Sequence, residues 1–498
     1  MLNTLLKKYW VYIFAGIISV ALAYLVALYQ QPFGADGILY LNAAKTFLQH
    51  GLKASMQIYN WPFYSILIAY TSKIFSLSAL NAAYVLNTIL DIITACAFAA
   101  ILKKLGAKTL LQLLGVLLLV TNPYVNHFRI HILRGHGYYA FALLAIFLLM
   151  QYATTRNWRY AISWNIAIII AVLFRIEGAI LFACLPLILF LQPEKNLRTK
   201  LNFVGFTYIL PIIILLIFTP IYLIFFYKHG ANLASSTGRI SEIFHQLRMG
   251  IILTWHNFSH TKELLRIKIL STAMPAGHGA TYFLFGGILG SLFGTIIEVT
   301  GVLYILLLLF CIWQNIINCR PEIKSIWLMS LGLTLVTPLW FFMQNNFLSG
   351  RYVALFFLLA LLSIPFALQK IYTNWKKHKP GLTGSKWLFP LVIIWIFLIT
   401  IDGIGHFGPS KTYLITAGRW IKNNTPKTIK LCCNDSQLFY YADRSGIIDD
   451  NHTKLMQYKC DYLALKIPKH VQRSSSPLNT IIFKNRRGDA AYIFKLKP

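Results

Sequence analysis

Acidic residues are scarce in this chain, whose 498 residues include 15 Asp and Glu against 46 Lys and Arg. Charged residues make up 12% of the chain, about half the share that is typical of soluble globular proteins. Hydrophobic residues reach 57%, and they form continuous runs rather than alternating segments. This composition excludes a soluble enzyme with a single anchor. It also excludes an outer-membrane β-barrel, whose strands alternate over about ten residues.

Several familiar site patterns are also missing. No Cys/His spacing is typical of a zinc site, no glycine-rich nucleotide-binding loop is present, and no internal repeat is found. Seven Cys are too few to form a disulfide scaffold in a chain of this length. Cys432, Cys433 and Cys460 share the C-terminal polar region and allow at most one pair among themselves. Whether they form a disulfide is left open by the sequence.

A net charge of +31 would suggest a nucleic-acid partner in a soluble chain. Here the basic residues lie in short loops between apolar runs. We therefore interpret them as contacts to anionic membrane lipids and as determinants of topology, and we expect no nucleic acid partner.

The apolar runs predict an all-α polytopic membrane protein with about eleven transmembrane helices, and up to thirteen are compatible with the pattern. The segment 62–77 follows Trp61-Pro62 and is predicted to be a helix at the outer surface. The predicted spans are 10–29, 82–102, 109–122, 138–153, 160–174, 176–191, 203–227, 287–313, 325–343, 352–369 and 387–404.

The distribution of Lys and Arg orients these spans. Basic residues concentrate in alternate short loops, which the positive-inside rule places in the cytoplasm together with the N-terminus. We therefore predict a bacterial inner-membrane protein with a membrane domain at 1–404 and a small periplasmic α/β domain at 405–498. The predicted outer loops are 30–61, 122–137 and 228–283.

The C-terminal region has its own pattern of secondary structure. A helix-like stretch at 413–422 ends at Asn423-Asn-Thr-Pro426. The strand-like runs that follow are 428–433, 462–467, 480–484 and 491–496. This mixture of a helix and strands predicts a compact α/β domain. We expect the domain to support the membrane domain rather than to catalyse, because it contains no group of residues typical of a nucleophile or metal site.

Asp36 lies a few residues beyond the first predicted span, in the segment Pro32-Phe-Gly-Ala-Asp36-Gly-Ile-Leu-Tyr40. Two interpretations stay open on local sequence. Asp36 caps the helix that follows, a role worth roughly 1 kcal/mol. Alternatively, its carboxylate is held at the outer membrane face, where it activates an acceptor nucleophile as a general base.

The wider pattern resembles the GT-C membrane glycosyltransferases, in particular the bacterial branch similar to dolichyl-phosphate-mannose–protein mannosyltransferases and to lipid A aminoarabinose transferase. The segments that carry this resemblance are Asp36 to Tyr40, Asn60-Trp61-Pro62-Phe63, Asn122-Pro123 leading to Arg134-Gly-His-Gly-Tyr138, Phe174-Arg175-Ile-Glu177-Gly178, Gly350-Arg351-Tyr352, Gly418 to Pro426, and Tyr440 to Arg444.

The resemblance implies transfer of a sugar from a polyprenyl-phosphate-linked donor to a lipid, glycan or protein acceptor, with Asp36 assisting the attack. The sequence departs from the family pattern at two places, and these departures leave metal dependence and the type of acceptor open. Position 37 is Gly, where the protein mannosyltransferases have a second acidic residue, and the loop 122–137 contains no acidic residue. The sequence predicts no definite cofactor. A divalent metal stays open as an alternative but has no support in the sequence.

A donor phosphate needs cationic partners, and Arg provides bidentate contacts that stay charged at membrane depth. The candidates are Arg134, Arg351, Arg129 and Arg175, with Tyr40, His131, His136 and Glu177 as supporting polar residues. For each arginine the alternative is a side chain that reaches to lipid headgroups. For Arg175 and Glu177 the further alternative is a structural ion pair.

Asp91 lies within the second predicted span, and Asn87 lies one turn away. A carboxylate at this depth indicates either a functional group or an interhelical polar contact. A second functional hypothesis therefore remains, a multi-span transporter or lipid flippase in which Asp91 and Glu298 couple to protons. Against this hypothesis, the sequence lacks the two-halves symmetry that is typical of transporters.

Overall fold

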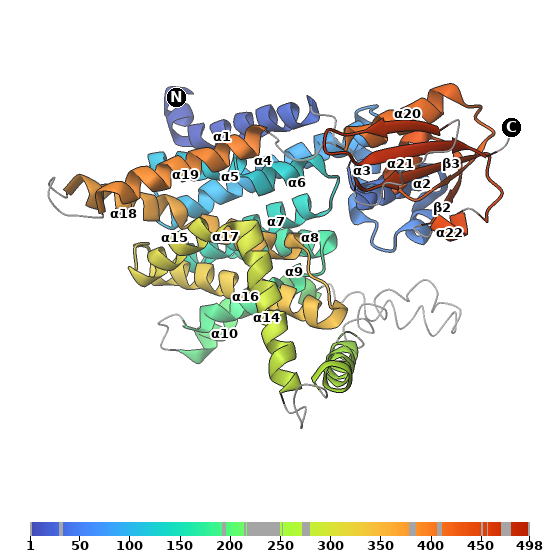
Figure 1. Cartoon of the computed structure of the whole chain (residues 1–498). Coiled ribbons are helices and arrows are strands. Elements are labelled where there is room, and N and C mark those ends of the chain that lie inside the picture. The colour runs from blue at the N-terminus through green and yellow to red at the C-terminus, as the bar shows by residue number, and fades with distance from the viewer. Residues whose placement is uncertain are drawn as a thin grey trace. The chain divides into compact units, whose positions relative to one another are not determined.

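The computed structural model describes residues 2–28, 33–191, 196–213, 216, 250, 252–270, 279–377, 385–405, 411–449, 452–455, 457–469 and 480–496. Helices dominate these residues, and a small sheet forms near the C-terminus (Figure 1). About half of the predicted span 203–227 and about half of the predicted outer loop 228–283 lie outside the described residues.

Six described helical segments are long and apolar enough to cross a membrane. They are Tyr9–Leu28 of α1 (Leu2–Leu28), α4 (Ala79–Lys104), α7 (Gly135–Thr155), α14 (Ala280–Thr300), α16 (Pro321–Asn345), and Gly350–Lys376, which contains α17 (Gly350–Leu361) and most of α18 (Ile364–Lys377). A bent pair, α5 (Thr109–Val120) with α6 (Pro123–Ile130), is a seventh candidate span. These helices confirm a predominantly helical, multi-pass membrane protein.

Shorter apolar helices account for further predicted spans. They are α8 (Trp158–Phe174), the segment Gly178–Leu191 made of α9 (Gly178–Cys184) and η1 (Leu185–Leu191), α15 (Val302–Trp313), and Phe389–Gly405 of α19 (Ser385–Gly405). The predicted single span 287–313 is instead divided between α14 and α15 at Gly301. The backbone there has φ +82°, which a helix does not accommodate. Other described helices before the C-terminal region include α2 (Ala35–Ile58), α3 (Phe63–Ile74), α10 (Leu197–Gly205), η2 (Phe206–Tyr208) and η4 (Arg266–Leu270).

Packing divides the chain into two compact units. Unit 1 contains Met1–Ala15, Ile93–Leu119 and Gly137–Val392. Unit 2 contains Gly16–Ile92, Val120–His136 and Ile393–Pro498. Within unit 2, the C-terminal residues therefore pack together with the first loop region. Phe33 makes edge contacts with the rings of Tyr440 and Tyr441, at centroid distances of 5.4 and 6.0 Å.

The C-terminal region of unit 2 forms a five-stranded mixed sheet in the order β2-β1-β3-β5-β4. β1 is parallel to β2 and β3, whereas β5 is antiparallel to β3 and β4. The elements are α20 (Thr412–Asn424), β1 (Lys430–Cys433), α21 (Ser436–Ala442), β2 (Ser445–Ile448), α22 (His452–Leu455), β3 (Tyr462–Ile467), β4 (Thr480–Lys484) and β5 (Ala490–Lys495). The predicted helix and four predicted strands are confirmed, and α21, β2 and α22 were not predicted.

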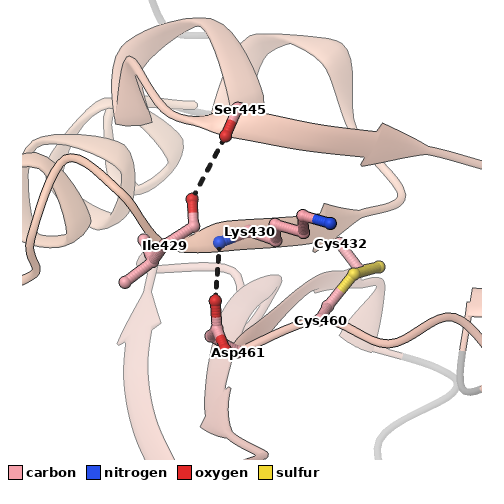
Figure 2. Close-up of a disulfide and its surroundings, with 6 residues drawn as sticks. All are labelled: Ile429, Lys430, Cys432, Ser445, Cys460 and Asp461. Atoms are coloured by element: carbon pink, nitrogen blue, oxygen red, sulfur yellow. Dashed lines mark hydrogen bonds between the residues drawn. A yellow bond between two sulfur atoms is a disulfide. The ribbon is translucent and has the colours of Figure 1, made fainter.

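Alternation along β1 assigns its cysteines to opposite faces of the sheet. Leu431 and Cys433 belong to the core that α20 and α21 cover. Cys432 belongs to the core on the other face, where it forms a disulfide with Cys460 (Figure 2). The strand register therefore selects which cysteine pairs, a choice that the sequence left open.

The disulfide gives a test of the predicted topology. Disulfides persist in oxidising compartments such as the periplasm and are rare in the cytosol. We therefore expect Cys432–Cys460 to be oxidised in intact cells. Its closed loop has a sequence separation of 28, so its removal should destabilise the domain by about 3–4 kcal/mol.

Differential alkylation of thiols followed by mass spectrometry measures the oxidation state. Cys433 is an internal control, because burial raises the pKa of its thiol to about 12 and the side chain is inaccessible in the folded domain. Free Cys432 and Cys460 in intact cells would place this domain on the cytoplasmic side and contradict the topology.

Candidate active site

The bend between α5 and α6 places the candidate histidines and arginines of unit 2. The two helices meet at 51°, and Asn122 caps α6 by accepting a 2.9 Å hydrogen bond from the Tyr124 backbone N–H. Pro123 at the first helical position lacks an N–H and disfavours helical backbone at Asn122, which explains the break. As a result, α6 carries Arg129 and leads directly to His131 and Arg134.

Asp36 is the second residue of α2, and Gly34 occupies the N-cap position. The alternative in which Asp36 caps this helix is therefore wrong. The Gly34 backbone N–H donates a 3.3 Å hydrogen bond to His131 Nδ1, which ties the start of α2 to the loop after α6. Asp36 is half-buried, and its carboxylate acts electrostatically on His131. A carboxylate in the first turn of a helix is favoured by the helix dipole.

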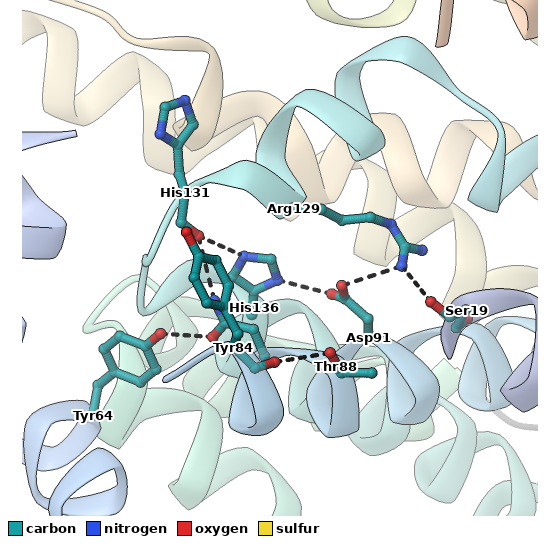
Figure 3. Close-up of polar contacts among 9 residues, drawn as sticks. Ser19, Tyr64, Tyr84, Thr88, Asp91, Arg129, His131 and His136 are labelled. Atoms are coloured by element: carbon teal, nitrogen blue, oxygen red, sulfur yellow. Dashed lines mark hydrogen bonds and ion pairs between the residues drawn. The ribbon is translucent and has the colours of Figure 1, made fainter. Parts of the chain in front are cut away.

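A buried polar network lies beside this loop (Figure 3). Asp91 Oδ2 is 3.5 Å from Arg129 Nη1, and Asp91 Oδ1 is 2.8 Å from His136 Nδ1. Arg129 Nη1 also donates to the Ser19 carbonyl oxygen at 3.1 Å, and His136 Nε2 lies 3.2 Å from the His131 carbonyl oxygen. Both ring nitrogens of His136 face acceptors, so both contacts are hydrogen bonds only when the ring carries two protons.

A second set of contacts joins α4 to α2 and α3. Asn87 donates from Nδ2 to the His131 carbonyl oxygen at 3.3 Å and accepts from the Tyr64 hydroxyl at 2.6 Å. The Tyr64 ring packs edge-on against Tyr40, which is 4% exposed. Asn87 and Asp91 thus make the interhelical polar contacts that the sequence offered as one alternative.

Arg134 lies in the same loop as His131. Its guanidinium is 5.7 Å from the centre of the Tyr59 ring, and Tyr59 packs edge-on against Tyr40. Tyr40 follows Asp36 by four residues on α2, so the two side chains lie on the same helix face. Among the described residues, Arg134 forms no ion pair or hydrogen bond through its guanidinium. Its donors therefore remain available for an anion.

Unit 1 contains the other two candidate arginines. α8 ends at Phe174, and Arg175 adopts an extended backbone, so Arg175 and Glu177 face each other despite their spacing of two residues. Arg175 donates from Nε to Glu177 Oε1 at 3.1 Å and from Nη2 to the same oxygen. Its guanidinium also lies 4.8 Å from the centre of the Tyr352 ring. The structural ion pair is present.

Arg351 lies in the first turn of α17. Its backbone carbonyl oxygen accepts a 2.7 Å hydrogen bond from the Tyr139 hydroxyl, and its guanidinium lies 5.6 Å from the centre of the Tyr352 ring. Together with Arg175 and Glu177, it lines a space of only about 10 Å³, on the order of a single water. This cluster of unit 1 therefore has aromatic walls and little free volume.

A cavity in unit 2 has a volume of about 290 Å³. We call it the α1–α4 cavity. It lies beside the Asp91–Arg129 pair and does not include Asp36 among its walls. The residues that line it are Ala23, Val26, Ala27, Phe33, Leu80, Asn81, Tyr84, Asn87, Thr88, Asp91, Arg129, Ile130, Ile415, Arg419 and Tyr441.

The sequence did not predict that several of these residues lie together. Asp91 was considered together with Asn87, whereas the structure also pairs it with Arg129 and His136. Arg419 and Tyr441 were placed in a supporting domain, and they line the cavity. The helical spacing of Asn87 and Asp91 is the one sequence signal that indicated the network. In the part of the chain that the structure describes, no three His, Cys, Asp or Glu side chains gather to hold a metal ion.

Acid should weaken the contact between His131 and Gly34. Burial, together with the nearby His127, Lys411 and His136, lowers the pKa of His131 to about 4, and Asp36 acts in the opposite direction. Between the ordinary value of about 6.5 and pH 4 the unfolded chain binds a proton that the folded chain does not, so stability falls as the pH falls through this range.

We expect the wild-type melting temperature to decrease from pH 6.5 to pH 4, and we expect a shallower decrease in His131→Gln. Thermal unfolding of the purified protein across this pH range measures the difference. An identical pH dependence in the two proteins would contradict a half-buried, neutral His131. His50→Gln is a matched control at an exposed position.

Comparisons with known proteins identify the fold. No protein-family model and no curated protein sequence matches the chain. Among solved structures, it is similar to the archaeal oligosaccharyltransferase AglB from Archaeoglobus fulgidus in complex with an inhibitory peptide and a dolichol-phosphate. The TM-score is 0.51 at 12% identity, covering 93% of this chain and 70% of that chain.

Two structures of ArnT from Cupriavidus metallidurans are also similar. The structure bound to undecaprenyl phosphate has a TM-score of 0.47 at 9% identity, covering 97% of each chain. The apo structure has a TM-score of 0.40 at 10% identity, covering 98% of each chain. The likeness to AglB shows the fold: the chain folds like that oligosaccharyltransferase, in line with the fold that the sequence resemblance implied.

Proposed function

We propose that this protein is a glycosyltransferase of the inner membrane that moves a sugar from a polyprenyl-phosphate-linked donor to a lipid, glycan or protein acceptor on the periplasmic side. Asp36 is the general base. It removes a proton from the acceptor as the acceptor attacks the anomeric carbon, and the bond from that carbon to the phosphate oxygen breaks. Polyprenyl phosphate then leaves with the electron pair of the broken bond.

The arrangement at the start of α2 carries this proposal. Asp36 lies in the first helical turn, where Gly34 is tied to His131 by the 3.3 Å hydrogen bond. The same loop presents Arg134, whose guanidinium donors are unoccupied among the described residues. The Gly34–His131 hydrogen bond therefore joins the helix start that carries the carboxylate base to the loop that carries a cation for the leaving phosphate. The GT-C fold is the second support.

The four arginines divide into direct and supporting roles in this proposal. In unit 2, Arg134 contacts the donor phosphate, whereas Arg129 is engaged by Asp91 and Ser19 and holds α6 in place. In unit 1, Arg351 is the second candidate for a phosphate contact. Arg175 is engaged by Glu177 and orients the rings of Tyr138 and Tyr352 around it. Tyr40, His131 and His136 shape the surroundings of Asp36.

Arg351→Lys keeps the positive charge and loses the planar fork that contacts two phosphate oxygens. We expect about tenfold weaker binding of undecaprenyl phosphate with an unchanged melting temperature, since charge-assisted bidentate bonds are roughly twice as strong as ordinary ones. Titration of undecaprenyl phosphate into the purified protein, followed by native mass spectrometry, measures the affinity. Arg134→Lys tests unit 2 in the same way. If neither variant binds more weakly than the wild type, these two arginines do not contact the phosphate.

The product of the reaction can be found by its mass, whichever sugar is transferred. Lipids, glycans and proteins from the cell envelope are compared by mass spectrometry between cells with the wild-type gene, cells with the Asp36→Asn variant and cells without the gene. We expect a pentose or hexose mass increment that only the wild type adds. Identical envelopes in all three strains, with the protein expressed, would count against glycosyl transfer.

A further inference from the structure

The α1–α4 cavity has an excess positive charge that the proposed reaction does not use. Its charged lining residues are Arg129, Arg419 and Asp91. Arg129 and Asp91 compensate each other at 3.5 Å, and both are largely buried. The charge of Arg419 remains uncompensated, because among the described residues it forms no ion pair and no hydrogen bond. The cavity therefore carries one uncompensated cation, supplied by α20 of the C-terminal domain.

The remaining walls combine polar and apolar groups in a way that suits an amphiphile. Hydroxyl and amide groups come from Tyr84, Tyr441 and Asn81. Ala23, Val26 and Ala27 of α1 and Leu80 of α4 form an apolar side. α1 is an apolar span candidate of which only 22% is buried, and of its lining residues Ala27 is exposed while Ala23 and Val26 are half-buried. In a membrane this side of α1 faces lipid, so the apolar wall is accessible to an acyl chain.

We propose that the α1–α4 cavity binds the anionic phosphate headgroup of a bilayer phospholipid, with Arg419 as its charged contact and the α1 residues beside its acyl chain. Arg favours this role, because its guanidinium contacts two phosphate oxygens at once. Tyr441 lies in the same wall and donates a hydrogen bond to the same group, since burial raises the pKa of its hydroxyl and keeps it protonated. This lipid is a bound component and not a substrate.

The buried network beside the cavity connects the bound lipid to the candidate site within unit 2. Arg129 and Asp91 form part of the cavity wall, Asp91 holds His136, and His136 contacts the His131 carbonyl oxygen. His131 in turn accepts the Gly34 N–H at the start of α2. A phospholipid that orders this wall therefore also supports the start of α2, which carries Asp36.

Binding is measured on the purified full chain by native mass spectrometry, in the absence of any sugar donor. The probes are phosphatidylglycerol and phosphatidylcholine with identical acyl chains. We expect the wild type to prefer phosphatidylglycerol. Arg419→Gln should weaken its binding about fivefold, in line with roughly 1 kcal/mol per basic residue at a lipid surface. Arg419→Lys keeps the charge and loses the fork, so its affinity should lie between those of the wild type and Arg419→Gln.

Matched variants separate the cavity from general effects of charge and bulk. Lys427→Gln removes one positive charge from an exposed position of the same domain and should leave the affinity unchanged. Ala23→Phe fills the apolar side of the cavity and should lower lipid occupancy, whereas Leu25→Phe changes a neighbouring residue outside the lining and should not. Melting temperatures confirm that each variant is folded.

The proposal is overturned if Arg419→Gln binds phosphatidylglycerol as well as the wild type does, or if Lys427→Gln loses as much affinity. Displacement of the lipid by millimolar inorganic phosphate would instead indicate a site for free phosphate. Displacement by equimolar undecaprenyl phosphate, with the same dependence on Arg419, would assign the cavity to the donor. No sugar is transferred in these measurements, so a negative result leaves the glycosyltransferase proposal unaffected. A negative result in a transfer assay likewise leaves the lipid-binding proposal unaffected.

Discussion

Asp36→Asn will lower the rate of sugar transfer by at least about a hundredfold while the protein still folds and inserts. A positioned general base typically contributes about 10²–10⁴-fold to the rate, and Asn cannot accept the proton of the acceptor. Asn has nearly the size of Asp, and the Gly34–His131 hydrogen bond involves neither side-chain oxygen of residue 36. The loss should therefore appear in the maximal rate, with little change in the affinity for the donor.

Asp443→Asn is the matched control for this variant. Asp443 lies in the C-terminal domain, its side chain is 67% exposed, and its ion pair with Lys422 is a surface contact. Loss of such a pair has a small effect on stability, and we expect unchanged transfer. Near-normal transfer by Asp36→Asn would leave Asp36 without a catalytic role. An equal loss in both variants would indicate that the assay reports damage to folding rather than chemistry.

Asp91→Asn will destabilise the protein strongly, by about 3–5 kcal/mol, because removal of one partner leaves a buried charge without compensation. The side chain of Arg129 is only 3% exposed and is paired with Asp91, and His136 is held by the same carboxylate. Asn can accept one hydrogen bond but supplies no negative charge. We expect a lower melting temperature and a lower yield of folded protein in detergent.

A double variant identifies the cause of this loss. Asp91→Asn combined with Arg129→Gln removes both charges of the pair, so it should be more stable than the sum of the single effects predicts, with a coupling of at least about 1 kcal/mol. Thermal or denaturant unfolding of the four proteins measures the coupling. Additive effects would show that the Asp91–Arg129 pair is not the source of the stability.

Composition and periodicity were sufficient to predict the helices and strands that a local sequence pattern specifies. Most predicted spans have a matching helix because an apolar run in lipid must satisfy its backbone internally. The strands β1, β3, β4 and β5 follow runs of branched and aromatic residues. By contrast, α21 depends on Asp435, which caps the helix by accepting from the Gln437 and Leu438 N–H groups. Lys466, a residue distant in the sequence, holds the same carboxylate at 2.8 Å.

The candidate site depends even more on contacts between residues that are distant in the sequence. From the position of Asp36 after the first span we predicted a functional carboxylate, with His131 and Arg134 as companions, and these roles stay predictions. The pairing of Asp91 with Arg129 and His136 depends on how α4, α6 and the start of α7 meet, which no local pattern encodes. Arg129 was therefore predicted to contact the donor phosphate, whereas its guanidinium is engaged within unit 2.

The central claim is that the bond between sugar and phosphate breaks at this protein. Polyprenyl-phosphate sugars extracted from the cells that naturally make the chain are reconstituted with the purified protein and an envelope extract as the acceptor source. Mass spectrometry then follows the lipid. We expect free polyprenyl phosphate to accumulate with the wild type and at least about a hundredfold more slowly with Asp36→Asn. If the sugar instead remains on its lipid and only crosses the bilayer, the protein is a flippase and the account is wrong.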